Sequence, residues 1–530
     1  MMAMNALISI SPVILLFVLM LGFKVKSHIS ALITLAATVA IALWAAPATG
    51  IATASAAESI GGTVGFAIME GVLKAFFPIL IIILMAIFSY NVLVESKQIE
   101  VIKDQFTSFT DDKGTLVLMM VWGFGGLLEG MAGFGTAVAI PAAILIGLGF
   151  KPMFSALVAL LGNTVATGFG AVGVPVTTLC NEVSAGSAAS AETIREISSF
   201  LIVQLSPLFF IIPFIILTLT DRKAVWRNLT LSLWTGGISL AVQYVCARWL
   251  GAETPAILGS IAAIAAIAVY AKLFAPKKKT TDRKARRYTA AETFRAWSVY
   301  IFILVLILVT GALCPPVEKF LKSNLVTTVT LPYIDSTFRF GWLSNAGLWL
   351  FVGSVAGGLV QGLGWRRLLT VLARTTVNLR FTTVTIVSLI ALASVMNHSG
   401  MISAIAIGLV AISGTFYPFF APLIGAIGTF VTGSDTSSNI LFGKLQASVA
   451  GQLGMSGQTS ALGVTGSESN WLAASNTTGA TGGKMISPQS IAIATAACDM
   501  EGKDDAILRK AIPYALLYIL IAGTIVILGS

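Results

Sequence analysis

The chain has 530 residues, of which 56% are hydrophobic and only 11% are charged, and its mean hydropathy is +0.90. A soluble domain carries about 25% charged residues, so this composition indicates a polytopic membrane protein in a lipid bilayer. No polar stretch is long enough for a soluble catalytic domain, and we do not expect an enzyme. The net charge of +10 is concentrated in the loop 275–297, which favours a cytoplasmic loop over a nucleic-acid site.

Cysteine and histidine are too sparse and too scattered to build a metal centre. The four cysteines show no CxxC spacing, and the two histidines, His28 and His398, lie far apart in the chain. This pattern indicates neither a disulfide framework nor a metal site. We therefore expect no metal and no cofactor.

Apolar runs of about 20 residues mark the membrane spans. We expect helices near residues 6–23, 29–47, 64–94, 197–219, 229–249, 255–274, 298–315, 345–362, 376–397 and 510–528. The turn with Lys24 and Lys26 places the first loop inside, and the loop 48–62, which has no Lys or Arg, falls outside. Residues 326–331 suggest a short β segment in an outside loop.

Four further segments carry glycine and polar residues where a membrane helix is normally apolar. Residues 114–149 and 416–453 predict helical hairpins, each with a glycine-polar turn in the middle. Residues 152–180 and 468–498 predict spanning helices that unwind at an Asn-Thr pair, Asn163-Thr164 and Asn476-Thr477. Non-helical backbone at that depth survives only inside protein or along a cavity, and paired interruptions in two halves point to a transporter binding site.

The fold class predicted is therefore an all-α membrane protein with an inverted-topology repeat, two helical hairpins, two broken helices and about 12 crossings. By loop charge, the first hairpin enters from the inside and the second from the outside. Residues 1–228 would form the first repeat half, residues 229–297 the linker helices with the basic loop, and residues 298–530 the second half. Both termini would lie outside the bacterial cytoplasmic membrane.

The polar residues at these breaks are the candidate binding groups for a small anion. Unwinding a helix exposes backbone N–H groups at a new N-terminus, which attracts carboxylates. A competing interpretation is that the Ser, Thr and Asn side chains only bridge neighbouring helices. The candidate substrate-binding residues are Asn163, Thr164, Gly433, Ser434, Thr436, Ser437, Ser475, Asn476, Thr477, Thr478 and Lys484.

Asp435 and Glu129 are the acids placed at the hairpin tips. An ionisable group inside the membrane is by default a functional hypothesis, so both are candidates for proton coupling, with Asp435 the first and Glu129 the symmetry-related second. The alternatives are a helix cap for Asp435 and a surface carboxylate for Glu129. Lys484 could pair with a substrate carboxylate or with Asp435, or its amine could reach the membrane surface. Candidate hinge residues in the first hairpin are Gly130, Gly133, Gly135 and Thr136.

Three motifs closely resemble the bacterial L-lactate permease family: residues 130–136 (GMAGFGT), 433–439 (GSDTSSN) and 484–492 (KMISPQSIA). The similarity in length and hydropathy extends over essentially the whole chain, although Ala137 stands where the family's first hairpin is expected to have proline. The resemblance implies proton-coupled uptake of L-lactate, with glycolate and D-lactate as related substrates. It also implies membership of a superfamily of ion transporters with hairpins and broken helices.

Physical reasoning agrees with that expectation. Importing an anion against an inside-negative potential costs about 2.3 kcal/mol per 100 mV, and a proton carried with it removes that cost. The alternatives are a transporter of the same architecture for another organic anion, a membrane subunit of a sodium-pumping decarboxylase, and a passive anion channel. The expected partners are the hydroxy-acid anion and a proton. The sequence is also compatible with a homo-oligomer.

Overall fold

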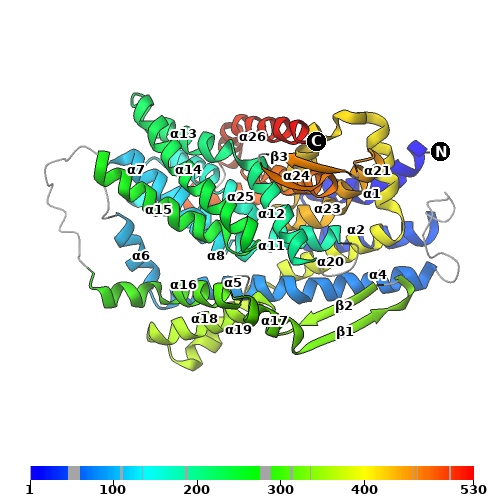
Figure 1. Ribbon diagram of the computed structural model, residues 1–530, viewed down its shortest axis with the longest axis horizontal. Coiled ribbons are helices and arrows are strands. Elements are labelled where there is room, and N and C mark those ends of the chain that lie inside the picture. The colour runs from blue at the N-terminus through cyan, green and yellow to red at the C-terminus, as the bar shows by residue number, and fades with distance from the viewer. Residues whose placement is uncertain are drawn as a thin grey trace.

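The computed structural model describes residues 2–45, 60–107, 112–133, 135–184, 189–274, 288–310, 314–334, 336–455, 457–461, 463–500 and 503–530. Phe134, most of the loop 48–62 and the cluster of basic residues at 277–287 lie outside the described residues. The described chain is mostly helical (Figure 1). Nine of its helices are long and apolar enough to cross a membrane, or up to eleven if each of two bent helix pairs is one span.

The helices of the first half are α1 (Met2–Phe17), α2 (Ser27–Ala40), α4 (Ile60–Lys74), α5 (Ile81–Glu95), α6 (Gln98–Thr107), α7 (Lys113–Leu118), α8 (Gly125–Met131), α9 (Thr136–Gly147), α10 (Pro152–Gly162), α11 (Gly170–Val183), α12 (Ala191–Leu205) and α13 (Leu208–Thr220). Short π-helical or 3-10 segments join several of them: η1 (Val18–Gly22), η2 (Ile41–Ala45), η3 (Ala75–Leu80), η4 (Met119–Phe124) and η5 (Val165–Phe169).

The remaining helices are α14 (Val225–Trp249), α15 (Pro255–Phe274), α16 (Ala290–Thr310), α17 (Pro315–Ser323), α18 (Ala346–Val360), α19 (Trp365–Asn378), α20 (Arg380–His398), α21 (Met401–Ser413), α22 (Tyr417–Thr432), α23 (Asp435–Gln452), α24 (Glu468–Lys484), α25 (Pro488–Ala497) and α26 (Asp504–Leu528). The strands β1 (Val326–Leu331), with the predicted β segment, and β2 (Ser336–Gly341) pair antiparallel, as do β3 (Gln458–Ala461) and β4 (Val464–Ser467). The 3-10 turns η6 (Pro332–Ile334) and η7 (Gly414–Phe416) complete the list.

Both predicted hairpins are present. The first consists of α7, η4 and α8, followed by α9, which packs back against α8 and η4. Gly133 (φ 64) and Gly135 (φ 85) make the turn between α8 and α9, and Gly433 (φ 73) makes the turn between α22 and α23. Only glycine adopts positive φ at little cost, which explains why a glycine stands at each tip.

The first broken helix is also present. Helix α10 ends at Gly162, the 3-10 segment η5 follows, and the two flanking helices are bent by 48°. The first residues of α11 are left-handed, with φ of 43, 59 and 76 at Ala171, Val172 and Gly173. The chain therefore unwinds from Asn163 onward, as the Asn-Thr pair predicts.

The second broken helix is interrupted at a different place from the predicted one. Helix α24 is continuous from Glu468 to Lys484, and the break falls at residues 485–487, before α25. The prediction that Ser475–Thr478 unwind is therefore wrong. The physical reason is that α24 packs backbone to backbone on α22: a methyl group at Gly479 or Gly483 would overlap the carbonyl oxygen of Pro422 or Ala426.

Helix α8 of the first hairpin and residues 471–483 of α24 are buried in the interior of the protein. In Figure 1, α13, α14 and α15 lie along one side of the molecule, and α16, α18 and α19 lie along the other side next to α5. The predicted linker helices are α14 and α15, which pack on each other. The division at residues 228 and 297, the inverted repeat and the twelve crossings stay predictions.

Candidate functional site

A cavity of about 660 Å³ lies where the two hairpin tips meet the two helix breaks. We call it the central cavity. Its lining includes Glu129, Gly133, Gly135, Thr167, Gly170, Ala171, Gly433, Ser434, Asp435, Thr436, Ser437, Lys484, Gln489 and Ser490. Four segments far apart in the sequence thus converge, and a small hydroxy acid fits this volume, since ligand pockets span about 300–1,000 Å³.

The N-termini of α9, α23 and α25 lie at the central cavity. Gly135 is the N-cap of α9, Ser434 is the N-cap of α23 and Ser487 is the N-cap of α25. The backbone N–H of Ser437 donates to the Ser434 side chain at 3.2 Å, and the N–H of Ser490 donates to Ser487 at 3.2 Å. Helix N-termini carry unpaired N–H groups and partial positive charge, so their convergence favours an anion in this cavity.

Lys484 and Glu129 form an ion pair inside the cavity. The distance from Lys484 Nζ to Glu129 Oε1 is 2.6 Å, and the two side chains are 12% and 2% exposed. Glu129 Oε2 has no hydrogen-bond partner among the described residues. The amine of Lys484 therefore lies among the hairpin tips and contacts Glu129. Lys484 does not reach the membrane surface, and Glu129 is not a surface carboxylate.

Asp435 is the first residue of α23 and is 3% exposed. Within the described part of the chain, neither of its carboxylate oxygens has a hydrogen-bond partner. The cap of α23 is Ser434, so Asp435 does not cap this helix through its side chain. An ionised carboxylate in such a place lacks the hydrogen-bond donors that normally stabilise a buried charge.

Ser475, Asn476, Thr477 and Thr478 are fully buried in α24 and do not line the central cavity. The side-chain Nδ2 of Asn476 and the hydroxyl of Thr477 both donate to Asn439 Oδ1, at 2.9 and 3.0 Å. These contacts are the helix-bridging role that was the competing interpretation. Further bonds between helices are Thr478 to Gln204 at 2.6 Å and Gln446 to Asn476 Oδ1 at 3.4 Å, whereas the Ser475 hydroxyl donates within α24 to Leu472 O at 2.6 Å.

Asn163 and Thr164 lie behind the cavity wall. With Lys484 and Ser490 they surround a gap too small for a water molecule. The Thr164 hydroxyl donates to Leu161 O at 2.8 Å, while Asn163 Oδ1 is buried without a partner among the described residues. These two residues therefore lie next to Lys484, on the side away from the central cavity.

Of the four hinge candidates, three lie at the turn of the first hairpin and one does not. Gly133 and Gly135 form the turn, and the Thr136 hydroxyl donates to Gly133 O at 2.8 Å. Gly130 instead sits inside α8, where an added methyl group would lie 3.0 Å from Ala256 Cβ. Gly130 therefore allows close packing against α15 and takes no part in the turn.

The left-handed turn at Ala171–Gly173 was not predicted from the sequence. Positive φ is a genuine outlier for a β-branched residue such as Val172, and such strain tends to cluster at functional sites. Gln489 was not predicted as a site residue either, although its side chain packs against the turn at Gly433. The available signals were the glycines at 168, 170 and 173 before Pro175, and Pro488 at the start of α25.

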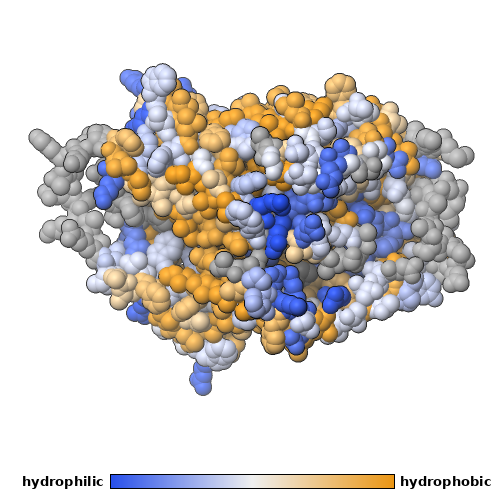
Figure 2. Space-filling view, in the orientation of Figure 1, coloured by the Kyte–Doolittle hydropathy of each residue, from blue (hydrophilic) through white to orange (hydrophobic). Residues whose placement is uncertain are grey.

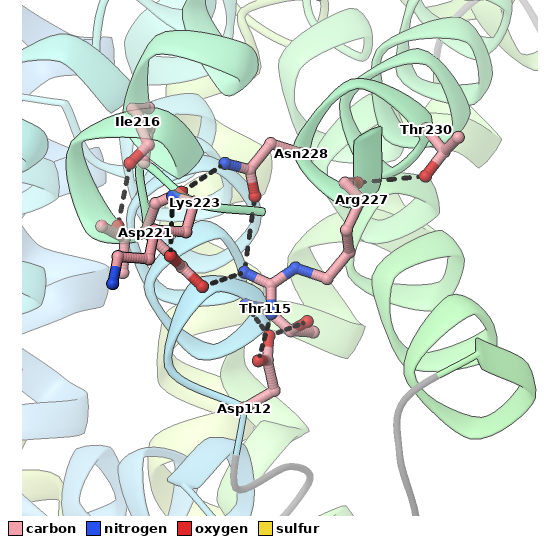
Figure 3. A network of polar contacts seen from close by, with 9 residues as sticks. Asp112, Thr115, Ile216, Asp221, Lys223, Arg227, Asn228 and Thr230 are labelled. Atoms are coloured by element: carbon pink, nitrogen blue, oxygen red, sulfur yellow. Dashed lines mark hydrogen bonds and ion pairs between the residues drawn. The ribbon is translucent and has the colours of Figure 1, made fainter. Parts of the chain in front are cut away.

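The base of the first hairpin is held by an ion-pair network (Figure 3). Asp112 caps α7 by accepting from the N–H and the hydroxyl of Thr115 at 2.8 and 2.7 Å. Arg227, at the start of α14, contacts Asp112 Oδ1 at 2.8 Å and Asp221 Oδ2 at 3.4 Å. The network fixes the entry of the hairpin to the loop between α13 and α14.

The amino-acid sequence is similar to those of known membrane permeases. A model of the L-lactate permease family matches residues 5–529. An L-lactate permease of Streptococcus iniae is 37% identical over 73% of this chain and 81% of that protein. Glycolate permease GlcA of Escherichia coli K12 is 32% identical, and L-lactate permease of Bacillus subtilis 168 is 31% identical, each over 99% of this chain and 96% of the relative.

The fold also has a solved counterpart. The crystal structure of the Alcanivorax borkumensis YdaH transporter matches with a TM-score of 0.51, covering 94% of this chain and 98% of that chain at 13% identity. At this identity the likeness concerns the fold alone.

Proposed function

This chain belongs to the L-lactate permease family, and from that premise we propose that it imports L-lactate and related 2-hydroxymonocarboxylates, such as glycolate and D-lactate, by proton symport. The observation that carries the proposal is the Lys484–Glu129 ion pair within a cavity at which α9, α23 and α25 begin. One cation, helix N-termini and short hydroxyl side chains are what a small hydroxy-acid anion requires.

The substrate carboxylate binds between Lys484 and the N-termini of α23 and α25. The first-turn N–H groups of those helices supply hydrogen-bond donors without burying another charged side chain. Thr436 and Ser437, in the first turn of α23, offer hydroxyl groups for the substrate's own hydroxyl. Asn163 and Thr164 support Lys484 from behind the wall.

Proton coupling follows from competition for Lys484. A substrate carboxylate that binds Lys484 displaces Glu129, which is 2% exposed and would be left as an uncompensated buried charge. Breaking a buried pair in this way is strongly unfavourable, so Glu129 takes up a proton as the anion binds. The loaded cavity then carries one anion and one proton more than the empty cavity.

Asp435 is the second candidate for the proton, because its carboxyl group lies in the same cavity without a partner among the described residues. A neutral Asp435 would add a donor for the substrate, and an ionised one would repel it. Replacing each acid in turn by its amide distinguishes the two candidates.

A second candidate function is transport of a different organic anion. A dicarboxylate needs a second cation, and Lys26 also lines the central cavity, although it is exposed. Competition by dicarboxylates against labelled L-lactate separates the two possibilities.

The test is uptake of radiolabelled L-lactate into proteoliposomes with an imposed pH gradient. We expect accumulation that a protonophore abolishes, that does not require sodium, and that glycolate inhibits. Lys484→Gln should eliminate this uptake, while Lys319→Gln, an exposed lysine that lines neither cavity, should retain it. Accumulation driven by sodium alone, or flux that never exceeds equilibrium, would contradict proton symport.

A further inference from the structure

A second cavity, of about 320 Å³, lies on the other side of the left-handed turn from the central cavity. Ala171 and Val174 line the central cavity, whereas Val172 lines the second one. A single backbone segment therefore separates the two. Figure 2 shows hydrophilic side chains gathered near the middle of one face, over the region of α11, α12 and α17 in Figure 1.

The second cavity contains cations that lack a carboxylate partner. Lys74 pairs with Glu70 at 3.4 Å, and Lys322 pairs with Glu318 at 2.6 Å. Arg195 and Arg339 also line the cavity, and within the described ranges neither has an acidic group within 4.0 Å. Arg195, on α12, is half-buried, while Arg339, on β2, is exposed.

Two acids share the cavity with Arg195 without pairing with it, Glu182 and Glu253. Glu253 lies in the loop between α14 and α15, and burial raises the pKa of its carboxyl group. Neither of these two carboxylates lies within ion-pair distance of Arg195 among the described residues, so its guanidinium is available to a ligand. Arginine presents a planar fork of donors that matches a carboxylate.

Asn345 provides a further polar group that lacks a partner. Its Oδ1 accepts from the N–H of Gly347 at 2.7 Å and caps α18, but its Nδ2 has no partner among the described residues. Asn345 is 6% exposed and lines the second cavity. Leaving a buried donor unpaired is costly, and a ligand oxygen would satisfy it.

We propose that the second cavity is a separate binding site for small hydroxymonocarboxylates, in which Arg195 holds the carboxylate and Asn345 donates to an oxygen of the same ligand. Apolar residues, including Phe77, Ile79 and Phe338, line the rest of the cavity and suit the carbon skeleton of a short acid. The substrate class rests on the proposed function, whereas the existence of the site rests on the residues named above.

The test is equilibrium dialysis of the purified full-length protein with radiolabelled L-lactate. We expect two molecules bound per wild-type chain, and one per chain in Arg195→Gln and in Lys484→Gln, because each variant retains the other site. Loss of a charged pair of hydrogen bonds should weaken binding roughly tenfold or more. Arg366→Gln, an exposed arginine outside both cavities, should bind two.

One molecule per wild-type chain, lost in Lys484→Gln and unchanged in Arg195→Gln, would overturn the second site and leave the proposed function intact. No lactate bound to the wild-type protein would instead overturn the proposed function. Arg195→Lys keeps the positive charge and removes the fork, so we expect it to weaken one site of the two. It serves as the test variant if Arg195→Gln does not fold, as judged by size-exclusion chromatography.

Discussion

At the scale of single residues, the contact between Lys484 and Glu129 separates the roles of the two acids in the central cavity. Glu129→Gln cannot take up a proton, and it frees Lys484 for the substrate. We expect exchange of L-lactate between equal pools to continue, while accumulation driven by a pH gradient falls to the level of protein-free liposomes. Both activities are measured on the same reconstituted protein.

Asp435→Asn is the matched comparison, since it also replaces a carboxyl group in the cavity with an amide. We expect it to retain accumulation driven by the pH gradient, although its affinity for lactate can change. If Asp435→Asn loses accumulation and Glu129→Gln keeps it, Asp435 carries the proton instead.

Asn476 illustrates a polar residue whose partners lie within the protein. Asn476→Ala removes a donor from Asn439 Oδ1 and the acceptor that Gln446 contacts. We expect the free energy of unfolding to fall by about 1–3 kcal/mol, measured by thermal unfolding in detergent. The affinity of the folded variant for L-lactate should stay within twofold of the wild type. A large loss of affinity without a loss of stability would return Asn476 to the binding site.

At the scale of structural elements, the tip of the second hairpin depends on Gly433. An alanine there would occupy left-handed backbone, at about 1–2 kcal/mol, and its methyl group would overlap the Gln489 side chain. We expect Gly433→Ala to reduce lactate uptake strongly, since the next residue, Ser434, is the N-cap of α23. Gly451→Ala is the control: it lies in the same helix with open space around it and should be neutral.

The base of the first hairpin allows a comparison of a helix cap with an ion pair. Asp112→Asn keeps an N-cap for α7 but loses the charge that faces Arg227, whereas Asp112→Ala loses both. We expect the asparagine variant to cost under 1 kcal/mol, because this pair is partly exposed, and the alanine variant about 1 kcal/mol more. Equal unfolding free energies for the two variants would contradict the capping role.

At the scale of the whole molecule, loop charges predict that both termini lie outside. Alkaline phosphatase fused after Ser530 should therefore be active in cells, because that enzyme needs an oxidising compartment. A green fluorescent protein inserted within residues 277–287 should fluoresce on the inner side. An inactive phosphatase at the C-terminus would reverse the predicted orientation.

The hairpins and the first break could be predicted because glycine and polar residues inside an apolar run allow few other structures. The position of the second break could not be predicted. Asn476 reads like Asn163 in sequence, but its partners Asn439 and Gln446 come from α23, and only the folded chain brings them together. The strained turn was also hidden, since alanine and valine at positions 171 and 172 have no tendency toward positive φ.

The glycine contacts between α22 and α24 have a mechanical consequence. Where two helices touch through their backbones, no flexible side chain lies between them to absorb sliding. The turn at Gly433 and the start of the break at Met485 are therefore carried by one rigid body. A transporter of this kind works by rocking one bundle against another around a fixed site, so we expect the hinge to lie elsewhere. The left-handed turn at Ala171–Gly173 is the place where a small change in torsion angles would move one cavity wall relative to that body.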